Sequence, residues 1–356
     1  SYNYFPYRYG QAFWSYVGST YGDTVIMPLF IETAKYGYDV AMRRVFGYDA
    51  QTMSTLWKNS MEQTYRSLGK DTVSKPIGVN IINNTNAGNM NVSPTISPDG
   101  KYIVFLSEKD LFAIDLYLAD AKTGNTIRKL GSKLTNKDID EFSFLESAGS
   151  FSPDSKKFAF SVFAEGKNKL MTIDLETGRT LHVEAMGDIV EFANITWAPD
   201  GKHVAFSGLK NGHSDIYIYN LETKSLRQLT DDVYSDYQPS FSKNGKYIVF
   251  STDRVALTSD YKSVDIPMNL ALLDVETGSI ENLPIFPGAN NLNPHFASND
   301  REIYFLSNSD GFRNMYRYLI ASATVERLTD YFTGISGITE YSPAMSISDT
   351  DEIVYS

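Results

Sequence analysis

The sequence predicts an all-β fold, a six-bladed β-propeller whose last blade is incomplete, preceded by a small α-helical segment. Two observations predict the propeller: a polar turn that recurs six times along the 356 residues, and a short apolar strand that follows each turn. A third, helical apolar spacing confined to the N-terminal part of the chain, predicts the helices. The turns begin at positions 97, 152, 198, 242, 297 and 347, and spacings of 44 to 55 residues are typical of four-stranded blades with loop insertions.

Each repeat begins as a hairpin. In the first copy, Ser97-Pro98-Asp99-Gly100 combines a proline that fixes φ, an acidic turn residue and a glycine that accepts positive φ. The following runs, such as 103–106, 204–206 and 248–250, are short and rich in β-branched or aromatic residues, so we expect buried central strands. A second hairpin follows in most copies, and two hairpins make one blade.

The sixth repeat contains only the beginning of a blade. Residues 353–355 start its second strand, and Ser356 is the last residue. We expect the missing strands to come from a polypeptide that continues beyond this chain. Residues 76–82 could supply one outer strand that closes the ring, which leaves one strand unassigned.

The N-terminal part has helical character. Four short helices are predicted over 8–21, 23–36, 38–46 and 49–68, separated by Gly22, Gly37 and Gly47, with Asp49 as an N-cap. The predicted organisation is a helical segment over 1–74, a linker and possible ring-closing strand over 75–90, and the propeller over 91–356.

Composition excludes several classes of function. The net charge of −11 argues against a nucleic-acid partner, which requires a basic surface. The chain has no Cys, so disulfides and thiolate metal sites are excluded. No apolar stretch approaches the roughly 20 residues that a transmembrane helix needs.

Two parts of the chain resemble known families. The Ser-Pro-Asp-Gly-Lys turn of residues 97–101 and its repeats resemble the TolB-like and WD-like propeller family over 91–356. Residues 7–18, 21–23, 43–49 and Trp57 resemble the final helices of a peptidase MA-like (gluzincin) domain, which directly precedes a TolB-like propeller in some bacterial envelope proteins. The resemblance implies the periplasm or the outer-membrane periphery of a Gram-negative bacterium.

Catalytic motifs are absent from the sequence. Gluzincins bind zinc through His-Glu-x-x-His, which does not occur here, and the four histidines have no metal-ligand spacing. Dipeptidyl-peptidase and tricorn-type enzymes also carry such propellers, but their Gly-x-Ser-x-Gly elbow is missing, since Gly334-Ile335-Ser336-Gly337 is one residue short. We therefore predict no catalytic residue, no cofactor and no bound metal.

The candidate binding site is one mouth of the central channel. Polar and aromatic residues recur where each innermost strand begins, several of them directly before a proline. Such residues can satisfy backbone groups and hold water in the channel, or they can contact a peptide or another ligand. The candidates are Ser93, Asn194, Gln238, Tyr237, Asn293, His295, Tyr341 and Ser342. The inserted loops 129–144 and 254–267 are further candidates for partner contacts.

The first functional hypothesis is a non-catalytic scaffold that binds a protein or peptide partner in the cell envelope, in association with an outer-membrane complex. The alternative is the substrate-filtering C-terminal part of a zinc metallopeptidase whose catalytic motif lies upstream of Ser1. A propeller that binds or cleaves sugars is a third possibility. Fold resemblance supports all three and does not choose among them.

Overall fold

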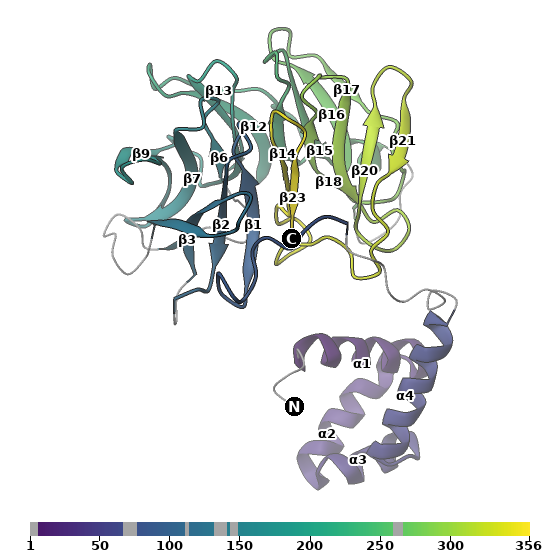
Figure 1. Cartoon of the computed structure of the whole chain (residues 1–356). Coiled ribbons are helices and arrows are strands. Elements are labelled where there is room, and N and C mark those ends of the chain that lie inside the picture. The colour runs from purple at the N-terminus through teal and green to yellow at the C-terminus, as the bar shows by residue number, and fades with distance from the viewer. Residues whose placement is uncertain (1–5, 67–76, 111–113, 132–140, 143–148, 259–265) are drawn as a thin grey trace. The chain divides into compact units, whose positions relative to one another are not determined.

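The structure, a computed structural model, describes residues 6–66, 77–110, 114–131, 141–142, 149–258 and 266–356. The chain divides into two compact units, Ser1–Ser74 and Lys75–Ser356. The first unit is helical and the second is built from β-sheets (Figure 1).

The second unit is a β-propeller of antiparallel sheets (Figure 1). The first sheet contains β1 (Asn91–Ile96), β2 (Tyr102–Ser107), β3 (Asp115–Asp120) and β4 (Thr126–Gly131). The second contains β6 (Ser150–Phe151), β7 (Lys157–Ala164), β8 (Lys167–Asp174) and β9 (Thr180–Ala185), and β5 (Glu141–Phe142) also pairs with β7. The third contains β10 (Glu191–Trp197), β11 (His203–Lys210), β12 (His213–Asn220) and β13 (Leu226–Gln228).

The remaining sheets repeat the same strand order. The fourth contains β14 (Asp236–Phe241), β15 (Tyr247–Thr252), β16 (Asn269–Asp274) and β17 (Ile280–Asn282), with the short helix α5 (Arg254–Thr258) between its second and third strands. The fifth contains β18 (Asn291–Phe296), β19 (Glu302–Ser307), β20 (Asn314–Leu319) and β21 (Thr324–Arg327). The last sheet has two strands, β22 (Met345–Ile347) and β23 (Ile353–Tyr355).

The prediction of a propeller whose last blade is incomplete is confirmed. Among the described residues five blades are complete, and the sixth position holds only the two-stranded sheet β22–β23. No strand is formed over residues 77–90, where the sequence predicts a possible ring-closing strand. Ile77 instead uses its backbone C=O to accept hydrogen bonds from the hydroxyls of Tyr331 and Tyr355, and Gly78 follows at φ 95°.

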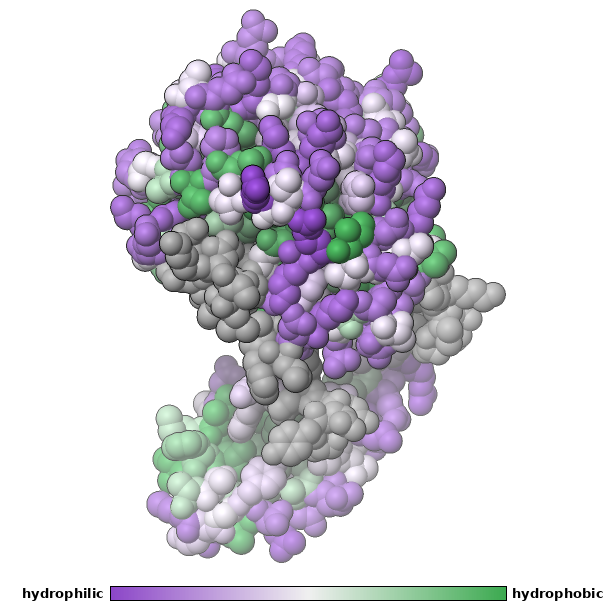
Figure 2. Space-filling view, turned by 60° about the vertical axis from the view of Figure 1, so that its left-hand side comes forward, coloured by the Kyte–Doolittle hydropathy of each residue, from purple (hydrophilic) through white to green (hydrophobic). Residues whose placement is uncertain are grey.

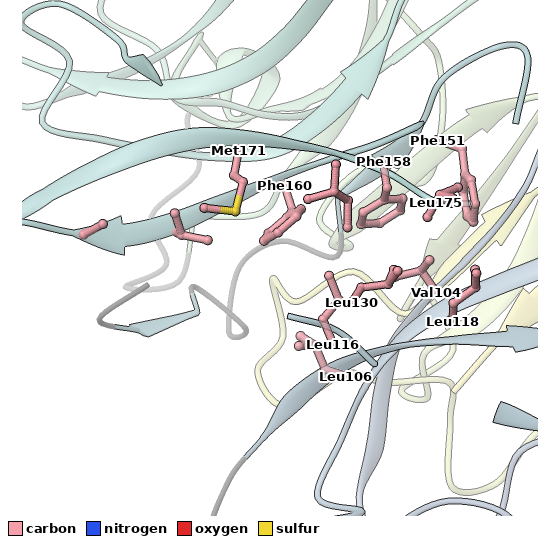
Figure 3. Close-up of a cluster of buried hydrophobic side chains, with 13 residues drawn as sticks. Val104, Leu106, Leu116, Leu118, Leu130, Phe151, Phe158, Phe160, Met171 and Leu175 are labelled. Atoms are coloured by element: carbon pink, nitrogen blue, oxygen red, sulfur yellow. The ribbon is translucent and has the colours of Figure 1, made fainter. Parts of the chain in front are cut away.

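The core lies between neighbouring blades. The second strand of each complete blade places an aromatic side chain in a buried position, as Phe105, Phe160, Phe206, Phe250 and Phe305 do. Figure 3 shows the cluster between the first two blades, where Val104 and Leu118 of one sheet face Phe158 and Phe160 of the next. Each blade covers its apolar faces with its neighbours, so stability depends on the ring.

The two-stranded sheet closes the ring against the first blade. The backbone N–H of Asp349 donates to the C=O of Pro98 at 2.9 Å, and that of Ile96 donates to the Ser346 hydroxyl at 3.3 Å. Val354 packs against the apolar cluster that contains Ile103 and Phe105. Among the residues that the structure describes, closure uses turn contacts and packing.

The helical unit contains α1 (Pro6–Tyr21), η1 (Asp23–Val25), α2 (Ile26–Tyr36), α3 (Tyr38–Phe46) and α4 (Ala50–Tyr65). Asp49 caps α4, because its Oδ1 accepts a hydrogen bond from the N–H of Thr52 at 2.8 Å. The core of this unit is small and centres on Leu29, Met42 and Met53. Figure 2 shows hydrophobic residues on the surface of this unit. Phe30, for example, is 70% exposed. None of the described helices is both long and apolar enough to cross a membrane.

Candidate binding site at the channel mouth

A β-bulge shapes the innermost strand of four blades. In the first blade, Val92 pairs with Leu106 and Thr95 pairs with Val104, so two residues of β1 oppose a single residue of β2. The same shift occurs in β10, β14 and β18. The first bulged residue has φ of 54–55° in every case, namely Ser93, Asn194, Gln238 and Asn293.

Side chains at the bulges link successive blades. The Asn293 N–H donates to Gln238 Oε1 at 2.6 Å, and the N–H groups of Ala344 and Met345 both donate to Asn293 Oδ1 at 2.9 Å. The N–H of Gln238 donates to the Ser207 hydroxyl of the preceding blade at 3.1 Å. A bulge leaves backbone groups without ladder partners, and these side chains satisfy them.

The axial channel has a volume of about 360 Å³ and many proline residues in its wall. It is lined by Asn194, Gln238, Asn293 and His295, and by seven prolines: Pro94, Pro98, Pro153, Pro199, Pro239, Pro294 and Pro343. On the side of the hairpin turns, Lys243 pairs with Asp349 at 2.5 Å and so joins the fourth blade to the sixth.

His295 is a neutral side chain in this channel. Its Nε2 lies 3.0 Å from both Asn293 Nδ2 and the C=O of Met345. Burial lowers the pKa of His295 to about 4, and the nearby Lys243 acts in the same direction. The imidazole is therefore uncharged at neutral pH.

A larger hollow, about 900 Å³, opens on the opposite side of the ring, where the loops between blades lie. We call it the loop-side hollow. Tyr237 and Tyr341 line it side by side, with ring centroids 6.2 Å apart and planes at 39°. Gln238 Nε2 donates to the C=O of Tyr341 at 2.7 Å and so fixes the second tyrosine beside the first.

The loop-side hollow is acidic. Glu191, Asp253 and Glu340 line it, and its lining includes no Lys, Arg or His among the residues that the structure describes. Asp253 is buried and accepts a hydrogen bond from the N–H of Ser235 at 2.9 Å, while Glu191 and Glu340 are exposed. Glu340 accepts from Asn290 Nδ2 at 2.7 Å, which holds its carboxylate at the rim.

The structure separates the predicted site residues into three groups. Tyr237, Tyr341, Asn194 and Gln238 meet at the loop-side hollow. Asn293 and His295 line the axial channel, which Asn194 and Gln238 also reach.

Ser93 and Ser342 form the third group, since they are buried and line neither space. Ser342 lies outside β22. Asn293 Oδ1, at the bulge of the fifth blade, instead accepts hydrogen bonds from the N–H groups of Ala344 and Met345. The sequence does not single out the carboxylates of the hollow, because Glu191, Asp253 and Glu340 come from three unrelated loops or strand ends.

One carboxylate cluster has the spacing of a metal site. Asp215, Asp232 and Asp236 bring carboxylate oxygens within 4.8 Å of one another. Arg254 pairs with Asp232 at 2.5 Å and with Asp236 at 2.6 Å, and thus supplies the compensating positive charge. Burial raises the pKa of Asp236 to about 6, and Arg254 opposes that shift. The cluster is explained as a buried ionic network.

Comparison with known proteins supports a TolB-like fold. Residues 145–264 match the family model described as "TolB beta propeller domain". The crystal structure of TolB from Acinetobacter baumannii aligns with a TM-score of 0.55 at 20% identity, over 80% of this chain and 71% of that one. The structure of a putative TolB from Agrobacterium tumefaciens aligns with a TM-score of 0.56 at 22% identity, over 75% and 90%.

The fold is that of a TolB-like β-propeller. An uncharacterized protein of Agrobacterium fabrum is 24% identical over 59% of this chain and 68% of its own length. The tricorn protease of Thermoplasma acidophilum is 29% identical over 32% of this chain, and dipeptidyl-peptidase 5 of Porphyromonas gingivalis is 25% identical over 52%. The matches span only 12% and 26% of those two proteins, so this chain is similar to a part of each.

Proposed function

We propose that this TolB-like propeller is a non-catalytic scaffold that binds a segment of a protein or peptide partner in its loop-side hollow. The observation that carries the proposal is the tyrosine pair set among carboxylates. Tyr341 is 43% exposed, and its ring lies beside Tyr237 at the opening of a space large enough for several side chains. Exposed tyrosines in a concave site are typical of protein-binding surfaces.

The charge of the hollow defines the chemistry of the segment. Glu191 and Glu340 are exposed acidic groups at the rim, and Asp253 adds a buried carboxylate. A segment with Lys or Arg beside an aromatic or aliphatic residue matches both properties, because a cation can meet the carboxylates and the faces of the tyrosine rings. An acidic segment would be repelled.

A peptide-display selection against the whole chain tests the proposal. We expect enriched peptides to carry a basic residue next to an apolar one. Tyr341→Ala should weaken their binding at least tenfold, because it removes an exposed ring from the hollow. Glu340→Gln should weaken it a few fold and reduce its dependence on salt. Binding is measured by fluorescence anisotropy at two ionic strengths.

Two matched variants control for general effects of substitution. Phe163→Ala removes an exposed aromatic ring of β7 outside the hollow, and Glu276→Gln removes an exposed carboxylate in the turn after β16. Both should bind as the unmodified chain does. Enriched peptides that lack basic residues, or equal losses in the control and hollow variants, contradict the proposal.

We also propose a location in the periplasm or at the outer-membrane periphery. The support is the TolB-like fold together with the resemblance of the N-terminal helices to the end of a peptidase MA-like domain in envelope proteins. Fractionation of cells that carry the natural gene, followed by immunodetection, checks this location. Recovery of the protein with the cytosolic marker contradicts it.

A second candidate function is substrate selection for a peptidase. The relatives that share parts of this propeller include a protease and a dipeptidyl-peptidase by name. In this version the hollow admits substrate segments to a zinc site encoded upstream of Ser1. Expression of the natural-length gene product, with a casein-hydrolysis assay before and after zinc chelation, tests it. Absence of chelator-sensitive hydrolysis rejects this candidate and leaves the scaffold proposal intact.

A further inference from the structure

Asp253 is the buried one of the three carboxylates that line the loop-side hollow. Its side chain faces this space although the residue is only 7% exposed. Its Oδ1 accepts a hydrogen bond from the N–H of Ser235 at 2.9 Å. Its Oδ2 has no hydrogen bond or ion pair with any residue that the structure describes. Buried charges in proteins are ordinarily paired, so this carboxylate is prepared to accept a cation from outside.

Arg254 follows Asp253 directly in the chain but does not compensate its charge. The N–H of Asp253 donates to the C=O of Ser235 at 3.3 Å, so the ladder between β14 and β15 continues by one more pair. Because side chains alternate between the two faces of a sheet, Asp253 shares the face of the hollow with Ser235 and Tyr237. The guanidinium of Arg254 lies on the opposite face, where it pairs with Asp236 at 2.6 Å.

The other two carboxylates of the hollow are less able to bind a cation. Glu191 is exposed, so water solvates its charge. Burial lowers the pKa of Arg313, and the nearby Glu340 opposes that shift, which means that Glu340 already faces a positive charge. Asp253 faces none among the described residues, and its burial reduces the screening by water. It therefore attracts a cation in the hollow more strongly than either rim carboxylate.

On the basis of the scaffold function proposed above, we propose that Asp253 recognises the partner by binding the guanidinium of one arginine side chain inserted into the loop-side hollow. Tyr237 is a diagonal neighbour of Asp253 on the same face, within reach of a single long side chain, and its ring lies beside that of Tyr341. Arginine fits better than lysine, because its planar guanidinium binds a carboxylate through two parallel hydrogen bonds and stacks on aromatic rings.

Three small compounds probe the site in the whole chain. They are N-acetyl-phenylalanyl-arginine amide and its citrulline and lysine counterparts. Citrulline replaces the guanidinium by a neutral urea group of nearly the same shape, and the phenylalanine supplies an apolar neighbour for the tyrosine rings. We expect the arginine compound to bind at least tenfold more tightly than the citrulline compound, with the lysine compound between them. Titration followed by nuclear magnetic resonance measures the three dissociation constants.

Asp253→Asn separates recognition from a structural role. Asparagine keeps an oxygen that can accept the N–H of Ser235, so the fold should survive. The affinity of the arginine compound should fall at least tenfold, while that of the citrulline compound should change less than twofold. A purely structural defect would weaken both compounds alike. Asp274→Asn is the matched control, because Asp274 also accepts a backbone N–H, that of Thr277 at 2.9 Å, and lies outside the hollow.

Four results overturn the proposal. They are absence of binding of the arginine compound at millimolar concentration, equal affinities of the arginine and citrulline compounds, tighter binding of the lysine compound, and equal losses for the arginine and citrulline compounds in Asp253→Asn. Failure of the scaffold function itself gives a different result. The peptide-display selection then enriches no peptide whose binding depends on Tyr341, whatever the affinities of the three compounds.

Discussion

Asn293 shows how one residue serves both the backbone and its neighbour. It occupies the left-handed region at φ 54°, which asparagine tolerates better than most residues. Its Oδ1 accepts two backbone N–H groups from the segment that leads into β22. The side chain therefore holds the two-stranded sheet to the fifth blade.

Asn293→Ala should be strongly destabilising. The two N–H groups of Ala344 and Met345 lose their acceptor in a buried place, which costs roughly 2–4 kcal/mol of unfolding free energy. Urea unfolding followed by circular dichroism measures the loss. Asn293→Gly also removes the acceptor but relieves the positive φ, so it should be less destabilising by about 1 kcal/mol. Equal stability of both variants and the unmodified chain contradicts this role.

The pKa values of His295 and Asp236 are shifted from their ordinary values, and the two shifts make the stability of the propeller change with pH in opposite directions. The pKa of His295 is about 4 in the folded chain, below its ordinary value of 6.5, so the unfolded state binds more protons and stability falls as pH drops from 6.5 to 4. The pKa of Asp236 is about 6, above its ordinary value of 3.8, so the folded state binds more protons and stability rises as pH drops from 6 to 3.8. These contributions oppose one another between pH 4 and 6.

The quantity to compare is the slope of the unfolding free energy against pH, rather than its absolute value. His295→Gln should remove the loss of stability that His295 causes as pH drops. The variant should therefore gain stability relative to the unmodified chain as pH is lowered from 6 to 4. Asp236→Asn should do the reverse. Urea unfolding at five pH values measures the slopes. Identical slopes for all three proteins would show that neither group titrates abnormally in the fold.

At the scale of elements, the inner strand of the second blade is tightly confined. Gly149 precedes β6 at φ 90°, and a Cβ there would lie 2.5 Å from the C=O of Ala159 and 2.6 Å from the Phe158 ring. Gly212, between β11 and β12, has φ 85°, and a Cβ there would meet no atom within 4 Å. The two glycines share a positive φ and differ in the space around them.

Gly149→Ala should therefore cost more than Gly212→Ala. The second substitution carries only the conformational cost of about 1–2 kcal/mol, and the first adds overpacking of about 1–3 kcal/mol. Guanidinium unfolding of both variants gives the difference. A Gly149→Ala variant as stable as Gly212→Ala would mean that Phe158 and the neighbouring strand move apart easily.

The repeated elements can be predicted from sequence, and the bulges cannot. The turns at 97, 152, 198, 242 and 297 and the buried runs after them predict the complete blades because turn chemistry and short apolar strands are local signals. The positive φ of Gln238 and the bond from Asn293 N–H to its Oε1 depend on the next blade, about 55 residues away along the chain. Ser342 is followed by a proline, as three of the four bulge residues are, yet it lies outside the strand.

The candidate site can be predicted only in part for the same reason. Tyr237 and Tyr341 stand near prolines in the sequence, and the structure brings their rings together. Glu191 and Glu340 give no sequence signal, since an acidic residue in a loop is ordinarily solvated. Only the closed ring places these carboxylates around one hollow.

At the scale of the whole molecule, the two units differ greatly in core size. The helical unit buries few large side chains, whereas the propeller has apolar clusters between successive blades. Small units bury a smaller fraction of their surface and are less stable.

The helical unit should unfold before the propeller on heating. Of the three tryptophans, Trp14 and Trp57 belong to the helices and Trp197 to the third blade. A double variant with Trp14→Phe and Trp57→Phe reports the propeller alone by fluorescence, while circular dichroism at 222 nm follows mainly the helices. We expect the 222 nm transition at the lower temperature. Coincident transitions would show that the units unfold as one cooperative body.

The prolines in the axial channel have a consequence for self-association. A strand edge with regularly spaced N–H donors can template a foreign strand, and proline removes one such donor at each place where it occurs. Pro94, Pro239 and Pro294 lie within the inner strands β1, β14 and β18, so these edges present interrupted rows of donors toward the axis. We therefore expect the inner strands not to pair between copies when the protein aggregates during synthesis or at high concentration. Chemical cross-linking of such aggregates should join residues at the periphery of the ring.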